Sequence, residues 1–573
     1  MKIISFFFLF FLCKSSFGQL VTEFDTLTYS TRMNSSLDSI DISGADYPST
    51  FDGGIAITSP YGLSISSLFN NYTTPSFLPN TNWSRMKFSA LPHLGFSYSF
   101  GGQGSQFIKA RYEQAFSDSM NLNITYQKRS GIGSIRNANF SVDDFTLQFQ
   151  RIGTFYSLSL KSSFHGSKIS HPGGVKTDTL INDFGLDFSP VNKSNANSRN
   201  RTGRVKLNNY FDFLKDTATS LGFISSHFYE IKNRIYLEDD SIAVLYGVSF
   251  IDSLQTRDQF NNASIANGGG AFFMSKKLYI DALLNYTYRE YQNLGQIKYI
   301  SELDFTSVAR LTNKNSRFEN DLRFNLMGRF NEFKEYLDAS YSSKNLTLSA
   351  NFLYQQKAPT YFQRIYFSNT SNYDVSTITL QKWLKIHGII TYQHTENIST
   401  SVFGGVASIS SVYQFNGSEW NNINANTTMS SIGVKSAIKL GVLNIHPRFV
   451  YSSDSRNFLP KVQAAGRIFL KGKLFKDKKL EAIIGVDASY ISSFDTKTYV
   501  PSMDTYDWSA QGGYFTEQVN LHAFVSLGIS KFRFFFRYEN IGYFWAEKKS
   551  EIISSYPIAV PRMRIGLTWD FVN

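Results

Sequence analysis

The sequence predicts an all-β fold: a transmembrane antiparallel β-barrel of about 22 strands, within a range of 18 to 24, preceded by a short irregular N-terminal segment. Three observations lead to this prediction. Apolar and polar residues alternate along many segments, these segments are long for strands, and the connections between them alternate between short and long. The chain is also short of charge, because charged residues make up 18% of it against roughly 25% in soluble proteins.

Alternation is clearest near the C-terminus, in residues 518–530. Every second residue there is apolar: Val519, Leu521, Ala523, Val525, Leu527 and Ile529. The residues between them are polar or small, with Phe524 as the exception. Because successive side chains of a strand point to opposite faces, the segment has one apolar and one polar face. The same pattern recurs in other segments: 108–113, 322–330, 532–539 and 563–571.

Segment length separates a membrane barrel from a soluble β-sandwich. Soluble strands usually run about five or six residues, whereas a tilted strand that crosses a membrane needs about 9–11. Many alternating segments here run from nine to eighteen residues. Since lipid offers the backbone no hydrogen-bond partner, such strands must close into a barrel, and two termini on one side require an even strand number.

Connection lengths give the orientation of the strands. Tight turns are predicted near Lys531 and Gly441 and at 476–479, 395–398 and 343–345. Long loops are predicted between them, at 165–202, 235–257, 357–376, 415–427, 495–513 and 546–562. Short connections at 101–105 and 331–335 fall on the same side as the long loops. Short periplasmic turns and long outside loops are typical of outer-membrane barrels, so we expect both termini in the periplasm.

The N-terminus predicts export. Lys2 precedes an apolar run at residues 3–12, and small residues follow at positions 16 and 18, so residues 1–18 are interpreted as a secretory signal peptide. The alternative is a lipoprotein acylated at Cys13, but the residues before that cysteine fit a lipoprotein signal poorly. Residues 19–92 form an irregular segment, either a lumen plug or a periplasmic tail, and residues 93–573 form the barrel.

Parity assigns a set of basic side chains to the lumen. The formal net charge of the chain is +12. The basic residues expected to line a pore are Lys109, Arg111, Arg323, Arg329, Arg467, Lys471, Arg533, Arg537 and Arg564. Rings of arginine and lysine in a pore favour anions, so we expect a weak anion preference. The alternative is that these side chains pair with acids, or with lipopolysaccharide phosphates near the rim.

Catalytic and cofactor motifs are absent from the sequence. It contains no G-x-S-x-G, H-E-x-x-H or P-loop motif, and 131–133 lacks the third glycine of a dinucleotide site. The histidines are scattered, and His522 is interpreted as a polar lumen residue. We therefore expect no enzyme activity, no cofactor and no metal site. No basic cluster accompanies a nucleic-acid-binding pattern, so nucleic acid is not expected as a partner.

The C-terminal residues carry a family resemblance. Residues 539–541, 556–557, 561–562 and 566–571 resemble the last hairpin of the "putative porin" family of Gram-negative outer-membrane barrels. They are also similar to the last hairpin of TonB-dependent receptor barrels. Residues 47–126 resemble the start of the porin family. A TonB-dependent receptor carries a plug domain of well over a hundred residues, and the 74 residues of 19–92 are too few for one.

The resemblance implies an outer-membrane channel for passive diffusion of small hydrophilic solutes. Its partners would be outer-membrane lipid, lipopolysaccharide, the barrel-assembly machinery and the solutes. Barrels of about 22 strands usually hold a plug, so we expect 19–92 or the loop at 165–202 to narrow the lumen. Two alternatives stay open: a substrate-specific transport component whose N-terminal segment occludes the lumen, and a surface adhesin or structural barrel without transport.

Overall fold

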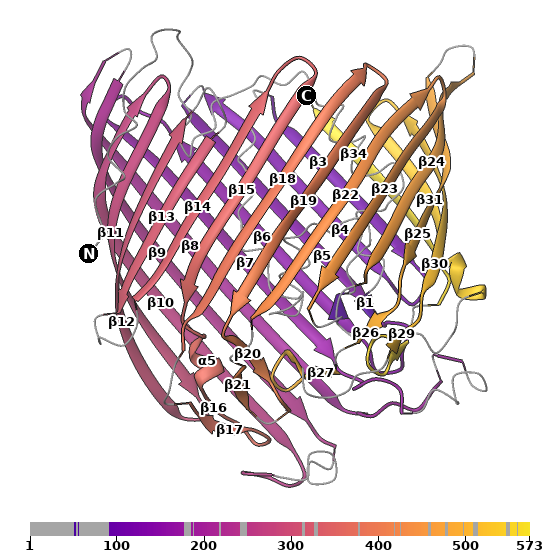
Figure 1. Cartoon of the computed structure of the whole chain (residues 1–573), viewed down its shortest axis with the longest axis horizontal. Coiled ribbons are helices and arrows are strands. Elements are labelled where there is room, and N and C mark those ends of the chain that lie inside the picture. Colours follow the sequence, from indigo (N-terminus) through magenta and orange to yellow (C-terminus); the bar gives the residue numbers. More distant parts are fainter. Residues whose placement is uncertain are drawn as a thin grey trace.

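The chain, seen in a computed structural model, forms a closed barrel of 22 antiparallel strands (Figure 1). This confirms the predicted fold class and strand number. The structure describes residues 51–52, 55–56 and 91–572, except for short gaps. The gaps are 118, 177–184, 187, 217–218, 241–248, 312–315, 326–330, 376–378, 418, 424–425, 456–459, 476–478, 497, 508–513, 546–550 and 558–559. The predicted signal peptide and nearly all of 19–90 lie outside the described residues.

Each barrel strand pairs with the next barrel strand along the chain. The barrel strands are β3 (His93–Gly101), β4 (Gln106–Ser117), β5 (Met120–Gly131), β6 (Phe140–Arg151), β7 (Tyr156–Ser170), β8 (Ala196–Lys215), β9 (Thr219–Glu238), β10 (Thr256–Ser275), β11 (Leu278–Asn293), β12 (Gln296–Leu311), β13 (Ser316–Asn325), β14 (Asn331–Ser342), β15 (Leu346–Lys357), β18 (Gln381–Thr395), β19 (Ile398–Ser410), β22 (Thr427–Leu440), β23 (Leu443–Asp454), β24 (Val462–Leu474), β25 (Leu480–Ile491), β30 (Gln518–Ile529), β31 (Phe532–Glu539) and β34 (Arg562–Val572). The first strand pairs with the last, from His93 opposite Val572 to Gly101 opposite Arg564, so the barrel has no edge.

Several strand ends differ from the sequence prediction. The loops predicted at 235–257, 357–376, 415–427, 495–513 and 546–562 are 239–255, 358–380, 411–426, 492–517 and 540–561 in the structure. Two further differences concern the strands themselves. Residues 165–170 belong to β7 and 196–202 to β8, so the connection between these strands is 171–195 rather than 165–202. Strands β8, β9 and β10 each have 20 residues, well beyond the roughly 11 that cross a membrane. Outside the bilayer both faces of a strand meet water, so a polar stretch continues the ladder without apolar alternation.

The second difference concerns β13 and β14. Residues 331–335, predicted as a short connection, lie within β14, and β13 ends at Asn325. The connection is therefore 326–330, which lies outside the described residues. The short connection predicted at 101–105 is confirmed, because β3 ends at Gly101 and β4 begins at Gln106.

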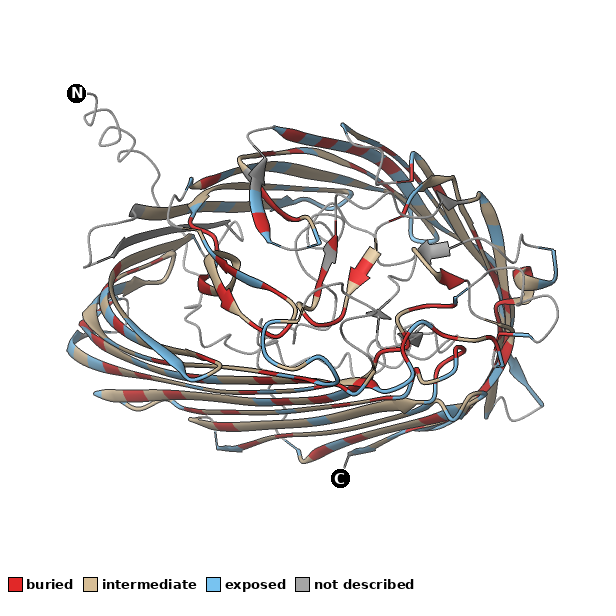
Figure 2. Cartoon of the chain, turned by 90° about the horizontal axis from the view of Figure 1, so that it is seen from below, coloured by how far each residue is buried: buried red, intermediate tan, exposed pale blue. Residues whose placement is uncertain are grey.

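Burial alternates along the strands as the sequence predicts. On β34, Met563 and Trp569 are exposed, whereas Arg564 and Thr568 are buried. Figure 2 shows the same alternation around the wall. The exposed apolar side chains form the outer surface, and the buried polar ones face the interior. Phe524, the exception to alternation, lies on the inner face and packs with Phe469 and Ile483.

The long connections carry small elements of their own at one end of the barrel (Figure 1). These are α5 (Tyr361–Arg364), β16 (Ile365–Phe367), β17 (Asn372–Asp374), β20 (Val412–Phe415), β21 (Trp420–Ile423), β26 (Phe494–Asp495), β27 (Thr498–Val500), β28 (Thr505–Asp507), β29 (Tyr514–Phe515), the 3-10 helix η3 (Ile541–Phe544), β32 (Glu551–Ile553) and β33 (Tyr556–Pro557). A separate two-stranded pair, β1 (Phe51–Asp52) and β2 (Ile55–Ala56), precedes the barrel. Within the described part of the chain, no helix is both long and apolar enough to span a membrane.

The loop cap is the name used below for the connections at this end. It comprises 132–139, 171–195, 239–255, 358–380, 411–426, 492–517 and 540–561. Seen from this end, segments of the loop cap cross the barrel opening (Figure 2). One four-stranded sheet, in the order β21-β20-β28-β27, joins two separate loops, because β20 lies in 411–426 and β28 in 492–517.

Candidate functional site

A network of ion pairs covers part of the inner wall, with charged residues on β24, β25, β31 and β34 and on into β3 and β4. Its centre is Asp487 on β25, whose side chain is fully buried. One oxygen of Asp487 accepts from Nε of Arg467 at 2.6 Å, and the other accepts from Nη1 of Arg537 at 2.6 Å. A buried carboxylate needs such partners, because removing an unpaired charge from water costs several kcal/mol.

Glu539 is the second centre of the network and is also fully buried. One oxygen lies 3.0 Å from Nε of Arg562 and 3.1 Å from Nη2 of Arg564, both on β34. The other oxygen lies 3.3 Å from Nε of Arg537. Register brings these groups together, since Glu539 is directly opposite Arg562 and Arg537 directly opposite Arg564. The carboxylate of Glu539 thus pairs with three guanidinium groups.

Two smaller groups extend the network towards the turn end of the barrel. Glu481 pairs with Arg533 at 2.6 Å and with Lys471 at 3.3 Å. Where the first and last strands meet, His93 lies between two carboxylates, 3.1 Å from Asp570 and 3.4 Å from Glu113. Charge pairing therefore continues across the closure of the barrel.

Most of the basic residues predicted from parity belong to this network. Six of them form ion pairs with acids of the wall: Arg111, Arg467, Lys471, Arg533, Arg537 and Arg564. Lys109, on β4, lies opposite Ser97 of β3. It precedes Arg111 by two residues and therefore faces the same side. Arg323 is on β13, where the structure does not describe the side chains, and Arg329 lies outside the described residues.

Sequence reasoning missed three members of the network. Arg562 and Glu481 share the parity of Arg564 and Asp487, so extending each pattern by a few residues towards the strand end would have found them. His93 begins the first strand, where too few residues precede it for a pattern. His522, predicted as a lumen residue, is buried, and its Nδ1 accepts a hydrogen bond from the backbone N–H of Asn540 at 3.0 Å.

The network has a small excess of positive charge. Apart from His93, its basic members are seven: Arg111, Arg467, Lys471, Arg533, Arg537, Arg562 and Arg564. Its acidic members are five: Glu113, Glu481, Asp487, Glu539 and Asp570. Pairing with acids, the alternative left open by the sequence, thus cancels most of the field from the arginines.

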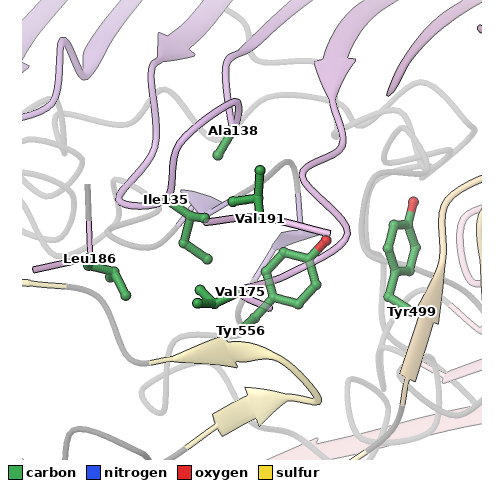
Figure 3. Packing of buried hydrophobic residues seen from close by; sticks show 7 residues of the cluster. All are labelled: Ile135, Ala138, Val175, Leu186, Val191, Tyr499 and Tyr556. Carbon is green, nitrogen blue, oxygen red and sulfur yellow. The ribbon is translucent and has the colours of Figure 1, made fainter. Parts of the chain in front are cut away.

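The loop cap is held by two hydrophobic clusters. The first joins four loops and consists of Ile135, Ala138, Val175, Leu186, Val191, Tyr499 and Tyr556 (Figure 3). The second consists mainly of Tyr366, Tyr373, Tyr413, Phe415 and Trp420. Strand β27 connects the two, because Tyr499 belongs to the first cluster and the next residue, Val500, packs against the second.

The loop 492–517 is also anchored to the far wall of the barrel. Arg234, buried on β9, donates hydrogen bonds to the backbone carbonyl oxygens of Pro501 and Ser502. In the strand order, β9 lies about halfway round the barrel from β25 and β30, which flank this loop. The loop therefore spans the opening from one wall to the other, and we call it the crossing loop.

A buried histidine adjoins this anchor. His171 is 2% exposed, its Nε2 lies 2.8 Å from Oγ of Ser198, and its ring contacts those of Tyr236 and Tyr499. Burial lowers the pKa of His171 well below its usual value, and the positive charges of Arg234 and Lys193 lower it further. The imidazole is therefore neutral at pH 7. No group of three potential metal ligands occurs among the described residues.

Comparisons with known proteins agree on the fold. A family described as "Putative porin" matches residues 88–573. The copper transporter OprC aligns with a TM-score of 0.60 at 8% identity, covering 85% of this chain and 82% of its own. The FrpB iron transporter from Neisseria meningitidis (F3-3 variant) aligns with a TM-score of 0.55 at 10% identity, covering 84% and 82%. No curated protein matches the chain in sequence.

A third similar structure is a receptor. BauA, the ferric preacinetobactin receptor from Acinetobacter baumannii, aligns with a TM-score of 0.52 at 9% identity, covering 84% of this chain and 80% of its own. At such identities the likeness concerns the fold alone. The resemblance of the last hairpin to receptor barrels, noted in the sequence, thus extends to the whole barrel architecture.

Proposed function

We propose that this chain, which belongs to the "Putative porin" family, is a channel through which small hydrophilic solutes diffuse passively. The protein lies in the outer membrane of a Gram-negative bacterium and has a transport or channel role. The observation that carries the finer proposal is the polar, charged inner wall of a barrel whose outer face is apolar. Such a wall offers solutes water and hydrogen-bond partners rather than a reaction, and barrels of this kind are typically not enzymes.

A weak anion preference forms part of the proposal. Apart from His93, the wall network has two more basic than acidic members, and Lys109 lies on the same face. Because nearly every guanidinium group already has a carboxylate partner, the remaining positive field is small. The preference should therefore be far weaker than that of a pore lined by unpaired arginines.

The loop cap supplies a constriction for this channel. A lumen enclosed by 22 strands is too wide to be left open, because barrels of that size usually hold a plug. The loop that includes Val175 and Val191 contributes to the first hydrophobic cluster, and the crossing loop spans the opening. We therefore propose that the loop cap narrows the channel; residues 19–92, either a lumen plug or a periplasmic tail by the sequence, lie almost entirely outside the described residues.

Substrate-specific transport is the second candidate function. The similar folds favour it, since OprC is a copper transporter, FrpB an iron transporter and BauA a ferric preacinetobactin receptor. In this case the segment 19–92 would occlude the lumen until a partner moves it. The barrel-assembly machinery is the partner that we propose for insertion under either function.

Single-channel conductance of the refolded protein in a planar bilayer tests the proposal. We would compare the full mature chain with a variant that lacks residues 19–92. Steady conductance of the full chain supports passive diffusion. Conductance only after the deletion makes the N-terminal segment a plug and favours specific transport. Silence of both forms, although the barrel is folded, overturns the channel and leaves an adhesin or a structural barrel.

A further inference from the structure

A cluster of cations that form no ion pair within the described part of the chain lies on the outer surface of the barrel, apart from the wall network. It consists of Lys168 on β7 and of Arg199 and Arg201 on β8, all three exposed. Lys168 is directly opposite Arg199 in the ladder, and Arg201 is opposite Gly166. Because side chains of a strand alternate with period two, Arg199 and Arg201 point to the same face.

Burial shows that this face is the lipid-facing one. Phe164 and Val205, which share the parity of the cations on their strands, are 48% and 39% exposed. The residues of opposite parity, Ser167, Ser198 and Thr202, are buried. The three cations therefore point away from the lumen and play no part in lining a pore.

The position of the cations along the strands is that of a membrane boundary. One row of the ladder consists of residues that are apolar or aromatic except for one glycine: Tyr126, Phe145, Phe164, Gly203 and Ile231. The next outward-facing row towards the loop cap contains Arg201, and the row after that contains Lys168 and Arg199. Each such step advances the strand by about 7 Å. The cations thus follow directly where the apolar belt ends, at the depth of lipid headgroups.

The cluster has no acidic partner among the residues that the structure describes. The nearest acid that faces outward in these rows, Asp143, already has partners of its own. It lies 3.8 Å from Nζ of Lys128 and accepts a hydrogen bond from the hydroxyl of Tyr126 at 2.9 Å. Like charges directly opposite in a ladder destabilise it, and Lys168 and Arg199 are such a pair. On the inner wall, by contrast, the arginines are matched with carboxylates. An anion from outside the chain would relieve the repulsion.

We propose that Lys168, Arg199 and Arg201 bind the phosphate group of an outer-leaflet lipid, of the phosphorylated glycolipid type found in lipopolysaccharide. Two guanidinium groups on one face can each offer a fork of donors to phosphate oxygens, and the ammonium group adds a third charge. The aromatic row next to the site provides the surface on which the acyl chains would lie. The inference rests on the outer-membrane location but not on transport.

Binding of lipid A to the purified barrel in detergent tests this proposal. Titrations with phosphorylated and with dephosphorylated lipid A are followed by native mass spectrometry. The wild type should prefer the phosphorylated form, and the triple variant K168Q/R199Q/R201Q should lose roughly tenfold in affinity for each guanidinium contact removed. Lys382→Gln is the matched control, because Lys382 is an exposed cation on the same surface of another strand, β18.

Several outcomes would overturn the inference. One is equal binding of the two lipid forms by the wild type, and another is an unchanged affinity in the triple variant. Inorganic phosphate that competes for the site at the same concentration as phosphorylated lipid A would make this a site for a free anion rather than for a lipid. Conductance is not part of the measurement, so a silent barrel that still discriminates the two lipids keeps this inference and loses only the channel.

Discussion

At the scale of single residues, Glu539 should contribute most to the stability of the wall network, because it pairs with three arginines. Its carboxylate is fully buried and is shared by Arg537, Arg562 and Arg564. Glu539→Gln would leave three buried cations around a neutral amide, and loss of one partner of a buried pair costs about 3–5 kcal/mol. We expect a loss of that size in the free energy of unfolding, measured by urea titration of the barrel in detergent micelles.

The matched control for this substitution is Glu481→Gln. Glu481 pairs with Arg533 and Lys471, but its side chain is 23% exposed, so water can solvate its partners. Its loss of stability should be clearly smaller. Equal stabilities of the wild type and Glu539→Gln would contradict a structural role for the pairing.

His171 predicts a pH response of the loop cap. Its pKa is lowered in the closed cap, so a released loop binds a proton more readily than the docked one. Docking is therefore fully favoured above the usual pKa of about 6.5 and weakens as the pH falls below it. Once the pH dependence of intrinsic amide exchange is corrected for, the described residues of 171–195 should lose protection from hydrogen exchange between about pH 7 and pH 5.

The groups around His171 support this direction. Arg234 and Lys193 are both cationic, and the neighbouring tyrosine rings offer no negative charge to an imidazolium. His171→Gln should make the corrected protection nearly independent of pH, whereas the exposed His394, replaced in the same way, should leave the response intact. An acid response that persists in His171→Gln would assign it to another group.

Parity from the sequence predicted the face of each charged residue but not its partner. Arg533, Arg537 and Arg564 lie on the buried face because a strand has a period of two, which any single segment reveals. Their pairing depends on register across β25, β31 and β34. Asp487 and Arg537 are 50 residues apart in the chain, so no local pattern joins them.

At the scale of elements, the crossing loop, which links β25 and β30, offers the clearest test of what limits passage through the barrel. Arg234 anchors it on the opposite wall through two backbone carbonyl groups. Arg234→Ala removes both bonds, and a hydrogen bond from a charged donor is worth about 1.5–3 kcal/mol. We expect the crossing loop to leave the opening at least roughly tenfold more often, seen as a higher open probability in single-channel records.

The control for Arg234 is again Lys382, a cation on the outer surface of β18 that is not part of the loop cap. Lys382→Ala removes an exposed charge at the same end of the barrel and should leave the records unchanged. Identical open probabilities for Arg234→Ala and the wild type would show that the crossing loop does not limit passage, and would return the constriction to residues 19–92.

Element boundaries were the weakest part of the sequence prediction, for a physical reason. Alternation arises from lipid on one face and water on the other, so it ends where the bilayer ends. Strand β8 continues for several residues beyond that point as Ala-Asn-Ser-Arg-Asn, which reads as a loop but pairs fully with β7 and β9. The positions of the long loops could be predicted, but their packing into the loop cap could not, because Tyr499 and Ile135 meet only after the barrel has closed.

At the scale of the whole molecule, the charges of the two barrel faces differ in their pairing. Inside, the carboxylates Asp487, Glu481 and Glu539 neutralise most of the basic wall. Outside, Lys168 and its neighbours have no acid within the described chain, which suits a surface that meets phosphate groups. The described wall network is thus nearly balanced in charge, whereas the cluster of Lys168, Arg199 and Arg201 on the outer surface is not. Net charge alone, read from sequence, could not have separated these two uses.

Ion selectivity tests this division. Neutralising one wall acid, Glu481→Gln, should raise the preference for anions, and neutralising its partner, Lys471→Gln, should lower it. At about 10 Å in water a unit charge changes an ion's energy by about 0.4 kcal/mol, so each variant should change the permeability of either ion by roughly twofold, in opposite directions for anion and cation. The change is read from the reversal potential in a potassium chloride gradient. Both shifts should shrink in concentrated salt, where the charges are screened. Shifts of the same sign in both variants would mean that the ions do not pass along this wall.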